Sequence, residues 1–348
     1  MDEKDRLLLT YLQNGLPLTA RPFEAWSAKI GADTAELLVR IQRLKKEKIF
    51  EGIKAILDPR AFHYQSAWVA TQFTREELGS HTEVFWKHPG VIYGCEREHG
   101  FNLWFFIAVP AGYDLELHVR CLEKLAGAQK VLFLPVRQVF KGTDFLSAWD
   151  AETFPVMNER FEKHQTGGSS DLTVEEIGMI RQLQEPFPLT DEPYRKIAAD
   201  LGITETQALE RIKALVKKGC LKRIGSFLKS TMVVPETKSL VVWQIPEEKL
   251  ERIGPEIADF GEVLYADRRL TFTEFPYSLY TMIRADTPAE IEALTRRMQD
   301  RIGKWPYRVL VTTRELKKER IKYFPKGLDM WWRESRRVVE TAFHGAEF

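Results

Sequence analysis

Apolar residues recur along the chain with two spacings, helical and alternating, that follow one another in blocks. The first block has three short stretches of helical spacing and then an alternating stretch. Asp33 or Thr34 can cap the third helix, and Glu36 suits its first turn. The predicted elements are helices over 5–13, 23–30 and 34–46 and a small wing over 49–57. This order predicts a winged helix-turn-helix domain over residues 1–60.

The next block is dominated by strand-like segments rich in aromatic and β-branched residues. Residues 90–105 form the clearest pair, with a turn at His99-Gly100 that carries most of the local charge. The predicted elements are strands over 66–73 and 131–140, the two strands of the hairpin 90–105, and helices over 74–87 and 114–126. A β-α-β-β-α-β order predicts a ferredoxin-like sandwich over residues 61–150.

The pattern then repeats. Leu16-Pro-Leu-Thr19 recurs as Phe187-Pro-Leu-Thr190, and Gly31 and Arg40 recur as Gly202 and Arg211 at a constant offset. The predicted domains are a polar, flexible linker over 151–170, a second winged helix-turn-helix over 171–232, a second ferredoxin-like sandwich over 233–325 and a C-terminal helix and tail over 326–348. The fold class is therefore α+β, as a tandem duplication whose halves pair as an internal pseudo-dimer.

Composition narrows the class of protein. The 348 residues are 44% apolar and 29% charged, with a net charge of +1, which is low for a chain built mainly to hold DNA. No apolar run approaches the roughly 20 residues of a membrane helix. The charged N-terminus lacks a signal core, and the three cysteines are widely spaced. We expect a cytoplasmic protein with no membrane contact and no zinc site.

The hairpin at 90–105 has a counterpart at 261–283. Tyr93 matches Tyr265, and Arg97 matches Arg269. The arm Asn102-Leu-Trp-Phe105 matches Ser278-Leu-Tyr-Thr281. A hairpin tip with Arg, His, Tyr and Cys is compatible with catalysis or with anion binding. One such tip alone could also be an ordinary solvent-exposed turn, because charged turns are common.

Several segments carry a resemblance to a known family. They are Leu16-Pro-Leu-Thr-Ala-Arg-Pro-Phe23, the hairpin 90–105, Phe275-Pro-Tyr-Ser-Leu-Tyr-Thr-Met282 and residues 313–324. The architecture resembles the Lrp/AsnC-type regulators, and the detail resembles the siroheme decarboxylases, with both subunits apparently fused in one chain. At the positions of the two histidines that this family uses at the tetrapyrrole, the chain has Tyr93 and Tyr265.

The resemblance implies removal of acetate carboxylates from siroheme, giving didecarboxysiroheme, or from a related acidic tetrapyrrole in haem or haem d1 biosynthesis. Iron enters with the substrate, and no further cofactor is required. The expected catalytic residues are Tyr93, Tyr265 and His99. The expected substrate-binding residues are Arg97, Arg268, Arg269, Arg137, Lys141, Arg314, Lys318, Asn102, Trp104 and Tyr277.

Each candidate also has an ordinary structural explanation. Tyr93 suits a proton donor or an axial iron ligand, and equally a core tyrosine. Cys95 is expected to be an inert buried thiol, with iron ligation as the alternative because Arg97 lies on the same strand face. The basic run at 314–322 equally suits a solvated strand edge.

Three functions therefore compete. The first is a fused siroheme decarboxylase, and the second is a non-catalytic tetrapyrrole carrier or sensor. The third is a DNA-binding regulator that uses the helices at 34–46 and 205–217, which offer few polar side chains to read base edges. A further homodimer is compatible with each of them.

Overall fold

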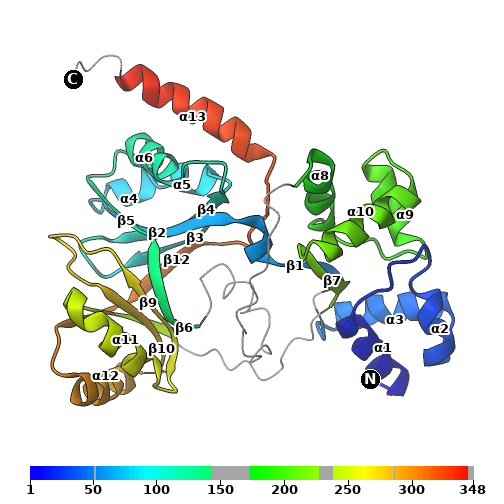
Figure 1. The fold of residues 1–348 in the computed structure, drawn as a ribbon, viewed down its shortest axis with the longest axis horizontal. Coiled ribbons are helices and arrows are strands. Elements are labelled where there is room, and N and C mark those ends of the chain that lie inside the picture. Colours follow the sequence, from blue (N-terminus) through cyan, green and yellow to red (C-terminus); the bar gives the residue numbers. More distant parts are fainter. Residues whose placement is uncertain (51, 143–171, 227–237, 286, 344–348) are drawn as a thin grey trace. The chain divides into compact units, whose positions relative to one another are not determined.

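The computed structural model describes residues 1–50, 52–142, 172–226, 238–285 and 287–343, which form two compact units (Figure 1). The first unit contains the described parts of 1–64, 150–232 and 322–325. The second contains those of 65–149, 233–321 and 326–348. The predicted linker at 151–170 and the end of the chain at 344–348 lie outside the described residues, and the domain boundaries stay a prediction. None of the described helices has the length and apolar character needed to span a membrane.

The first unit combines the helix-turn-helix regions of both halves. Its elements are α1 (Glu3–Asn14), α2 (Glu24–Ile30), α3 (Thr34–Lys46), β1 (Lys54–Leu57), η1 (Pro59–Phe62), α8 (Val174–Leu183), α9 (Pro193–Asp200), α10 (Glu205–Lys217) and β7 (Leu221–Gly225). The third helix begins as the sequence predicts, because the Asp33 side chain accepts a hydrogen bond from the Glu36 amide. Leu37, Ile41 and Leu44 then face inward.

The predicted wing takes a different form. The strand expected over 49–57 is shortened to β1, which pairs antiparallel with β7 of the other half and places Ala55 opposite Ile224. Each half therefore contributes one strand to a shared two-stranded sheet. A strand with few residues gains from this arrangement because its backbone groups find partners across the duplication.

The second unit combines the two sandwiches. The first half supplies β2 (Tyr64–Gln72), α4 (Glu77–Ser80), α5 (Glu83–Lys87), β3 (Val91–Arg97), β4 (Leu103–Pro110), α6 (Leu115–Ala126), β5 (Lys130–Leu134) and β6 (Val136–Lys141). The second supplies β8 (Lys238–Trp243), η2 (Glu247–Lys249), α11 (Leu250–Ala258), β9 (Val263–Arg269), β10 (Leu279–Arg284), α12 (Pro288–Ile302), β11 (Tyr307–Leu310), β12 (Thr312–Lys318) and α13 (Gly327–Phe343). The strand orders β5-β2-β4-β3 and β11-β8-β10-β9 are the ferredoxin-like order in both halves.

The two halves exchange a strand, which the sequence analysis missed. The single strand predicted over 131–140 is broken at Pro135, and β5 stays in its own sheet while β6 pairs with β9 of the second half. In return, β12 leaves β11 and pairs with β3 of the first half. Proline lacks the amide that a continuing ladder requires, so the break at Pro135 has a local cause.

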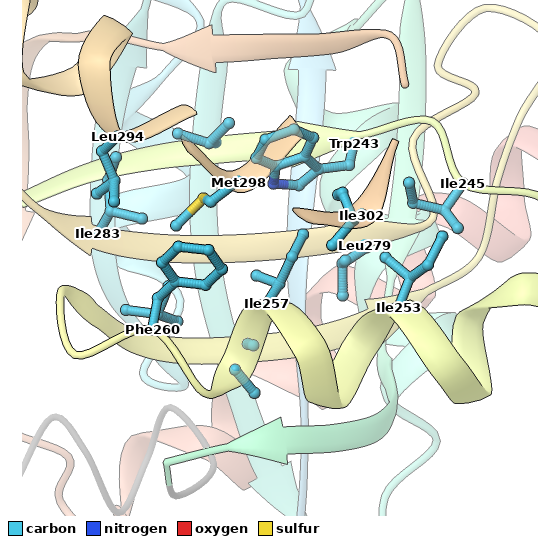
Figure 2. Close-up of a cluster of buried hydrophobic side chains, with 14 of the residues drawn as sticks. Trp243, Ile245, Ile253, Ile257, Phe260, Leu279, Ile283, Leu294, Met298 and Ile302 are labelled. Carbon is cyan, nitrogen blue, oxygen red and sulfur yellow. The ribbon is translucent and has the colours of Figure 1, made fainter. Parts of the chain in front are cut away.

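Helices cover one face of each sheet and close a separate core. In the second half, Trp243, Ile253, Ile257 and Met298 lie among the apolar side chains between β8, α11 and α12 (Figure 2). Phe140 of the exchanged strand packs against Gly254, where an added Cβ would lie 2.5 Å from its ring.

In the first half, the prediction of one helix over 74–87 is wrong in one respect. The structure has two short helices there, α4 and α5. Between them the Thr82 hydroxyl donates to the Leu78 carbonyl, which offers the backbone a competing local partner.

The C-terminal helix α13 lies against α6 (Figure 1). Its Trp331 and Trp332 rings stack on His118 at centroid distances of 5.4 and 4.3 Å. His118 Nδ1 lies 2.9 Å from His88 Nε2, and both imidazoles are fully buried. The C-terminal helix predicted within 326–348 is thus present as α13 and begins at Gly327.

Candidate functional site

Two equivalent hairpins carry the candidate residues. In the first, β3 pairs with β4 so that Cys95 lies opposite Trp104. In the second, β9 pairs with β10 so that Asp267 lies opposite Tyr280. Because side chains alternate across a strand, residues two apart share a face. The face away from the helices therefore carries one row of candidates in each half.

We name these rows by their residues. The first cluster is Tyr93, Cys95, Arg97 and Trp104. The second cluster is Tyr265, Asp267, Arg269 and Tyr280.

The first cluster holds a buried arginine against an aromatic ring. Arg97 is 6% exposed, and its guanidinium carbon lies 5.3 Å from the centre of the Trp104 ring. Arg97 Nη1 donates to the Leu310 carbonyl at 2.8 Å, and its Nε has no hydrogen-bond partner among the described residues. Tyr93 lies beside Trp68, with ring centroids 5.6 Å apart. The cluster thus combines a cation, a phenol and an aromatic wall.

Burial sets the protonation of the groups next to Arg97. Removal from water raises the pKa of the Tyr93 phenol, although the Arg97 charge acts in the opposite direction. Burial likewise raises the pKa of the Cys95 thiol, again against the effect of Arg97. Tyr93 is therefore a neutral hydrogen-bond donor at pH 7. Cys95 is a neutral thiol, which favours the inert role over iron ligation.

The second cluster has the same layout with an added carboxylate. Arg269 is 4% exposed and lies 4.2 Å from the centre of the Tyr280 ring. Asp267 accepts from Arg269 through both oxygens, with Nε–Oδ1 at 2.8 Å and Nη2–Oδ2 at 2.7 Å. The pair is fully buried, and the Asp267 carboxylate holds the pKa of Arg269 above its usual range against the cost of burial. Burial also raises the pKa of Tyr280.

The two hairpin tips meet at Phe275. This buried ring lies 5.3 Å from His99 and 5.7 Å from Trp104 of the first hairpin. It also lies 6.4 Å from Tyr280 of its own hairpin. Burial lowers the pKa of His99, and the nearby Arg308 charge adds to the effect. His99 is therefore neutral at pH 7, and its Nδ1 accepts a hydrogen bond from the Phe101 amide at 3.0 Å.

The remaining predicted residues are spread around these clusters. Tyr277 is close, with its ring 4.9 Å from Phe275. Asn102 uses its amide to bond both backbone groups of Phe73, so it holds the end of β2. Arg268 points to the helix side of its sheet, where it pairs with Glu247 and Glu251.

The cations on the exchanged strands lie on β6 and β12, which pair with the strands that carry the hairpin rows. Lys141 donates to the Phe260 carbonyl at 2.7 Å, whereas Arg137 is exposed on β6. Arg314 and Lys318 are also exposed, and their carboxylate partners are Glu96 at 3.6 Å and Glu315 at 3.7 Å. These residues lie on the outer strands of the two sheets, and Lys318 is the cross-strand neighbour of Tyr93 in the first cluster.

Three residues of this site were not predicted from the sequence. They are Asp267, Tyr280 and Phe275. An Asp two residues before an Arg on one strand shares its face, so the spacing of Asp267 and Arg269 could have predicted their ion pair. Tyr280 could have been found from its match to Trp104. The position of Phe275 depends on how the two loops meet, which no local pattern records.

The comparisons with known proteins agree with this architecture. A model of the siroheme decarboxylase NirDL-like HTH domain matches residues 5–50 and again residues 176–221. A model of the AsnC-like ligand binding domain matches residues 236–317. A siroheme decarboxylase of Hydrogenobacter thermophilus is 31% identical over 331 residues, which cover 94% of this chain and 97% of that protein.

The chain belongs to the siroheme decarboxylase family. The siroheme decarboxylase NirDL subunit of Paracoccus denitrificans is 28% identical over 90% of this chain and 95% of its own length. A solved structure of siroheme decarboxylase NirDL in complex with an iron-uroporphyrin III analogue matches 97% of this chain with a TM-score of 0.72 and 29% identity. Those relatives span both halves, so the fused arrangement predicted from the internal repeat is confirmed.

Proposed function

We propose that this chain is a siroheme decarboxylase that removes acetate carboxylates from siroheme, or from a related acidic iron tetrapyrrole in haem or haem d1 biosynthesis. The observation that carries the proposal is the full-length match to a siroheme decarboxylase at 31% identity. The solved NirDL complex supports the ligand class, because a structural relative that covers 97% of this chain holds an iron-uroporphyrin III analogue.

The residues present are suited to a flat polyanion. Siroheme carries eight carboxylates around its ring, so its site needs guanidinium groups and apolar walls. Arg97 offers a donor, its Nε, that no described residue uses, and Trp104 and Trp68 supply aromatic surface beside it. These features support a carboxylate of the substrate as the partner of Arg97.

The reaction is balanced by a proton alone. The bond between the methylene carbon and the carboxylate carbon breaks, the electron pair stays on the methylene carbon, and CO2 leaves. A proton then joins that carbon, so an acetate arm becomes a methyl group and no oxidant is consumed. The pyrrole-type ring of the substrate supplies the electron sink.

Tyr93 is our candidate for the proton donor. Its phenol stays protonated at pH 7 because burial raises its pKa, and Arg97 stabilises the phenolate that remains after transfer. Tyr265 is the equivalent phenol of the second cluster. His99 is neutral at the hairpin tip and suits a hydrogen-bond donor or acceptor toward the substrate rim.

The regulator hypothesis loses support from the ion pairs of α3. Arg40 is paired with Asp2 and Asp5, at 2.7 and 2.9 Å, and with Glu36 of its own helix. Arg43 shares Asp5 at 2.7 Å. Cations neutralised inside the protein contribute little to phosphate binding. The first helix-turn-helix region is therefore better suited to scaffolding than to DNA recognition.

One anaerobic experiment separates the three functions. Purified protein is mixed with siroheme, and the visible absorbance spectrum of the mixture is recorded over time. The pigment is then extracted and its mass is measured by mass spectrometry. We expect binding followed by loss of one or two CO2 per pigment. Bound but unchanged siroheme would favour a carrier. Absence of binding, together with a salt-dependent shift of promoter DNA, would favour a regulator. A dependence of the sedimentation coefficient on concentration would reveal the further homodimer.

A further inference from the structure

The two halves of the molecule have the same arginine–aromatic arrangement, but among the described residues only the arginine of the second half has a neighbouring carboxylate as its partner. Arg97 lies over Trp104 and Arg269 lies over Tyr280, at 5.3 and 4.2 Å from the ring centres. Both guanidinium groups are more than nine-tenths buried. Geometry alone would therefore make the two positions equivalent.

The residue two positions before each arginine breaks the equivalence. In the second half it is Asp267, which takes Nε and Nη2 of Arg269 in a two-point ion pair. In the first half it is Cys95, a fully buried thiol that carries no charge.

Two carboxylates on the strands around Arg97 are also engaged elsewhere. Glu96 pairs with Arg314 at 3.6 Å, and Glu315, the cross-strand neighbour of Cys95, pairs with Lys318 at 3.7 Å. Among the described residues, Arg97 has no ion-pair partner, and its Nε is without a hydrogen bond.

A buried guanidinium without a counter-charge is costly, because Arg97 has lost water and gained only the Leu310 carbonyl at 2.8 Å and the face of the Trp104 ring. An arriving carboxylate recovers that cost at Arg97. It recovers far less at Arg269, because Asp267 already supplies the counter-charge and accepts from Nε and Nη2, so that only Nη1 lacks a hydrogen bond. A second carboxylate beside Arg269 would also be repelled by Asp267, so anion binding is favoured in the first half and disfavoured in the second.

We infer that only the first half binds a carboxylate of the substrate, at Arg97. In the second half, the Asp267 carboxylate occupies the equivalent anion-binding position beside Arg269. The inference rests on the proposed function for the identity of the anion. It gives a stoichiometry of one tetrapyrrole per chain. It also makes the residue at position 95 a determinant of substrate binding, since an acidic side chain there would form an ion pair with Arg97 and occupy the anion-binding position of the first half.

The internal repeat supplies the decisive variant. Cys95→Asp places in the first half the residue that the second half already carries at the same register, so the ion pair it creates is one this fold accommodates. The probe is the iron complex of uroporphyrin III, titrated by its visible absorbance under anaerobic conditions. Cys95→Asn has nearly the same size as Cys95→Asp and no charge, and it is the matched control.

We expect one site per wild-type chain, an affinity loss of about tenfold or more in Cys95→Asp, and a loss of less than about threefold in Cys95→Asn. Asp267→Asn should keep the first site within about twofold of wild type, because Arg97 is untouched. Circular dichroism and thermal melting establish that each variant is folded. Should Cys95→Asp unfold, Arg97→Met provides the same comparison against Arg269→Met.

Several results would overturn the inference. They are two equal sites in the wild type, no binding at all, equal affinities of Cys95→Asp and Cys95→Asn, or a greater loss from Arg269→Met than from Arg97→Met. The readout is binding and does not depend on turnover. Wild-type protein that binds one pigment but releases no CO2 would therefore refute the proposed function and leave the assignment of the binding half intact.

Discussion

Phe275, in the tip of the second hairpin, lies against Trp104 of the first hairpin with 5.7 Å between ring centroids. Phe275 also contacts His99 and Phe101 of the first hairpin, and it is fully buried. The two repeated tips thus form one aromatic cluster, which fixes the relative position of the two arginine rows.

Removal of the Phe275 ring should uncouple the tips. We expect Phe275→Ala to lower the free energy of unfolding by about 3–5 kcal/mol, because a fully buried aromatic side chain leaves a cavity. Urea denaturation measures this loss. Phe272→Ala in the same loop, where the side chain is only partly buried, is the control and should cost about 1 kcal/mol. Equal losses in the two variants would show that the tips are held together by other contacts.

The sequence predicted the fold well where the signal is local or repeated. The Asp33 cap, the β-α-β-β-α-β order and the duplication are all confirmed. The strand exchange was missed because β6 has the same alternation whether it pairs with its own half or with the other, and only Pro135 marks the break. The match of Arg97 to Arg269 was visible in the sequence, and so was the Asp267 counter-charge two residues before Arg269, whereas the burial of both guanidinium groups depends on how the strands pack.

The contact between Gly254 and Phe140 of the exchanged strand β6 predicts the effect of a substitution on stability. An added Cβ there would lie 2.5 Å from the Phe140 ring, so Gly254→Ala should displace the exchanged strand. We expect a loss of about 1–3 kcal/mol in the free energy of unfolding, measured by urea denaturation.

A second helical glycine provides the control for Gly254. Gly178 in α8 has no atom within 4 Å of an added Cβ, and Gly178→Ala should stabilise the protein by up to about 1 kcal/mol through helix propensity. Stabilisation by both substitutions would contradict the contact between Phe140 and Gly254.

The proton-donor role of Tyr93 is tested by loss of one oxygen atom. We expect Tyr93→Phe to bind siroheme within about threefold of wild type and to decarboxylate it about 100-fold or more slowly, because the ring remains and the proton source is lost. Single-turnover kinetics after anaerobic mixing measure the rate. Tyr307→Phe removes a hydroxyl that bonds Thr295 in the core of the second half, and it controls for general damage. Wild-type turnover in Tyr93→Phe would exclude the role.

The buried imidazole pair predicts how stability depends on pH. Burial lowers the pKa of His88 well below its usual range, and it lowers the pKa of His118 to about 4. The charged neighbours that act on them are Lys317, which lowers the pKa of His88, and Asp114, which raises that of His118. Both rings are therefore neutral in the folded protein at pH 7.

In the unfolded chain the two histidines titrate near their ordinary pKa of about 6.5, so below that pH the unfolded state binds more protons. Their contribution to stability is fully present above about pH 6.5 and is lost progressively as the pH falls toward 4. We expect a loss on the order of 2 kcal/mol for each histidine, about 4 kcal/mol together, between pH 7 and 5, measured by urea denaturation. The fluorescence of Trp331 and Trp332 should report it, since both rings stack on His118.

His118→Phe keeps an aromatic ring in the stack and removes one of the two groups that titrate. The slope of stability against pH should fall by about one proton in this variant. A slope equal to that of wild type would show that the pair does not control stability in this range.

Decarboxylation by this chain should break a carbon–carbon bond and replace CO2 with a proton that comes from solvent. The mass of the pigment after anaerobic incubation of siroheme with the protein in D2O measures both events. We expect loss of one or two CO2, with one deuterium incorporated for each CO2 lost. Siroheme recovered at its original mass from a protein that has bound it would show that the chain is not a siroheme decarboxylase.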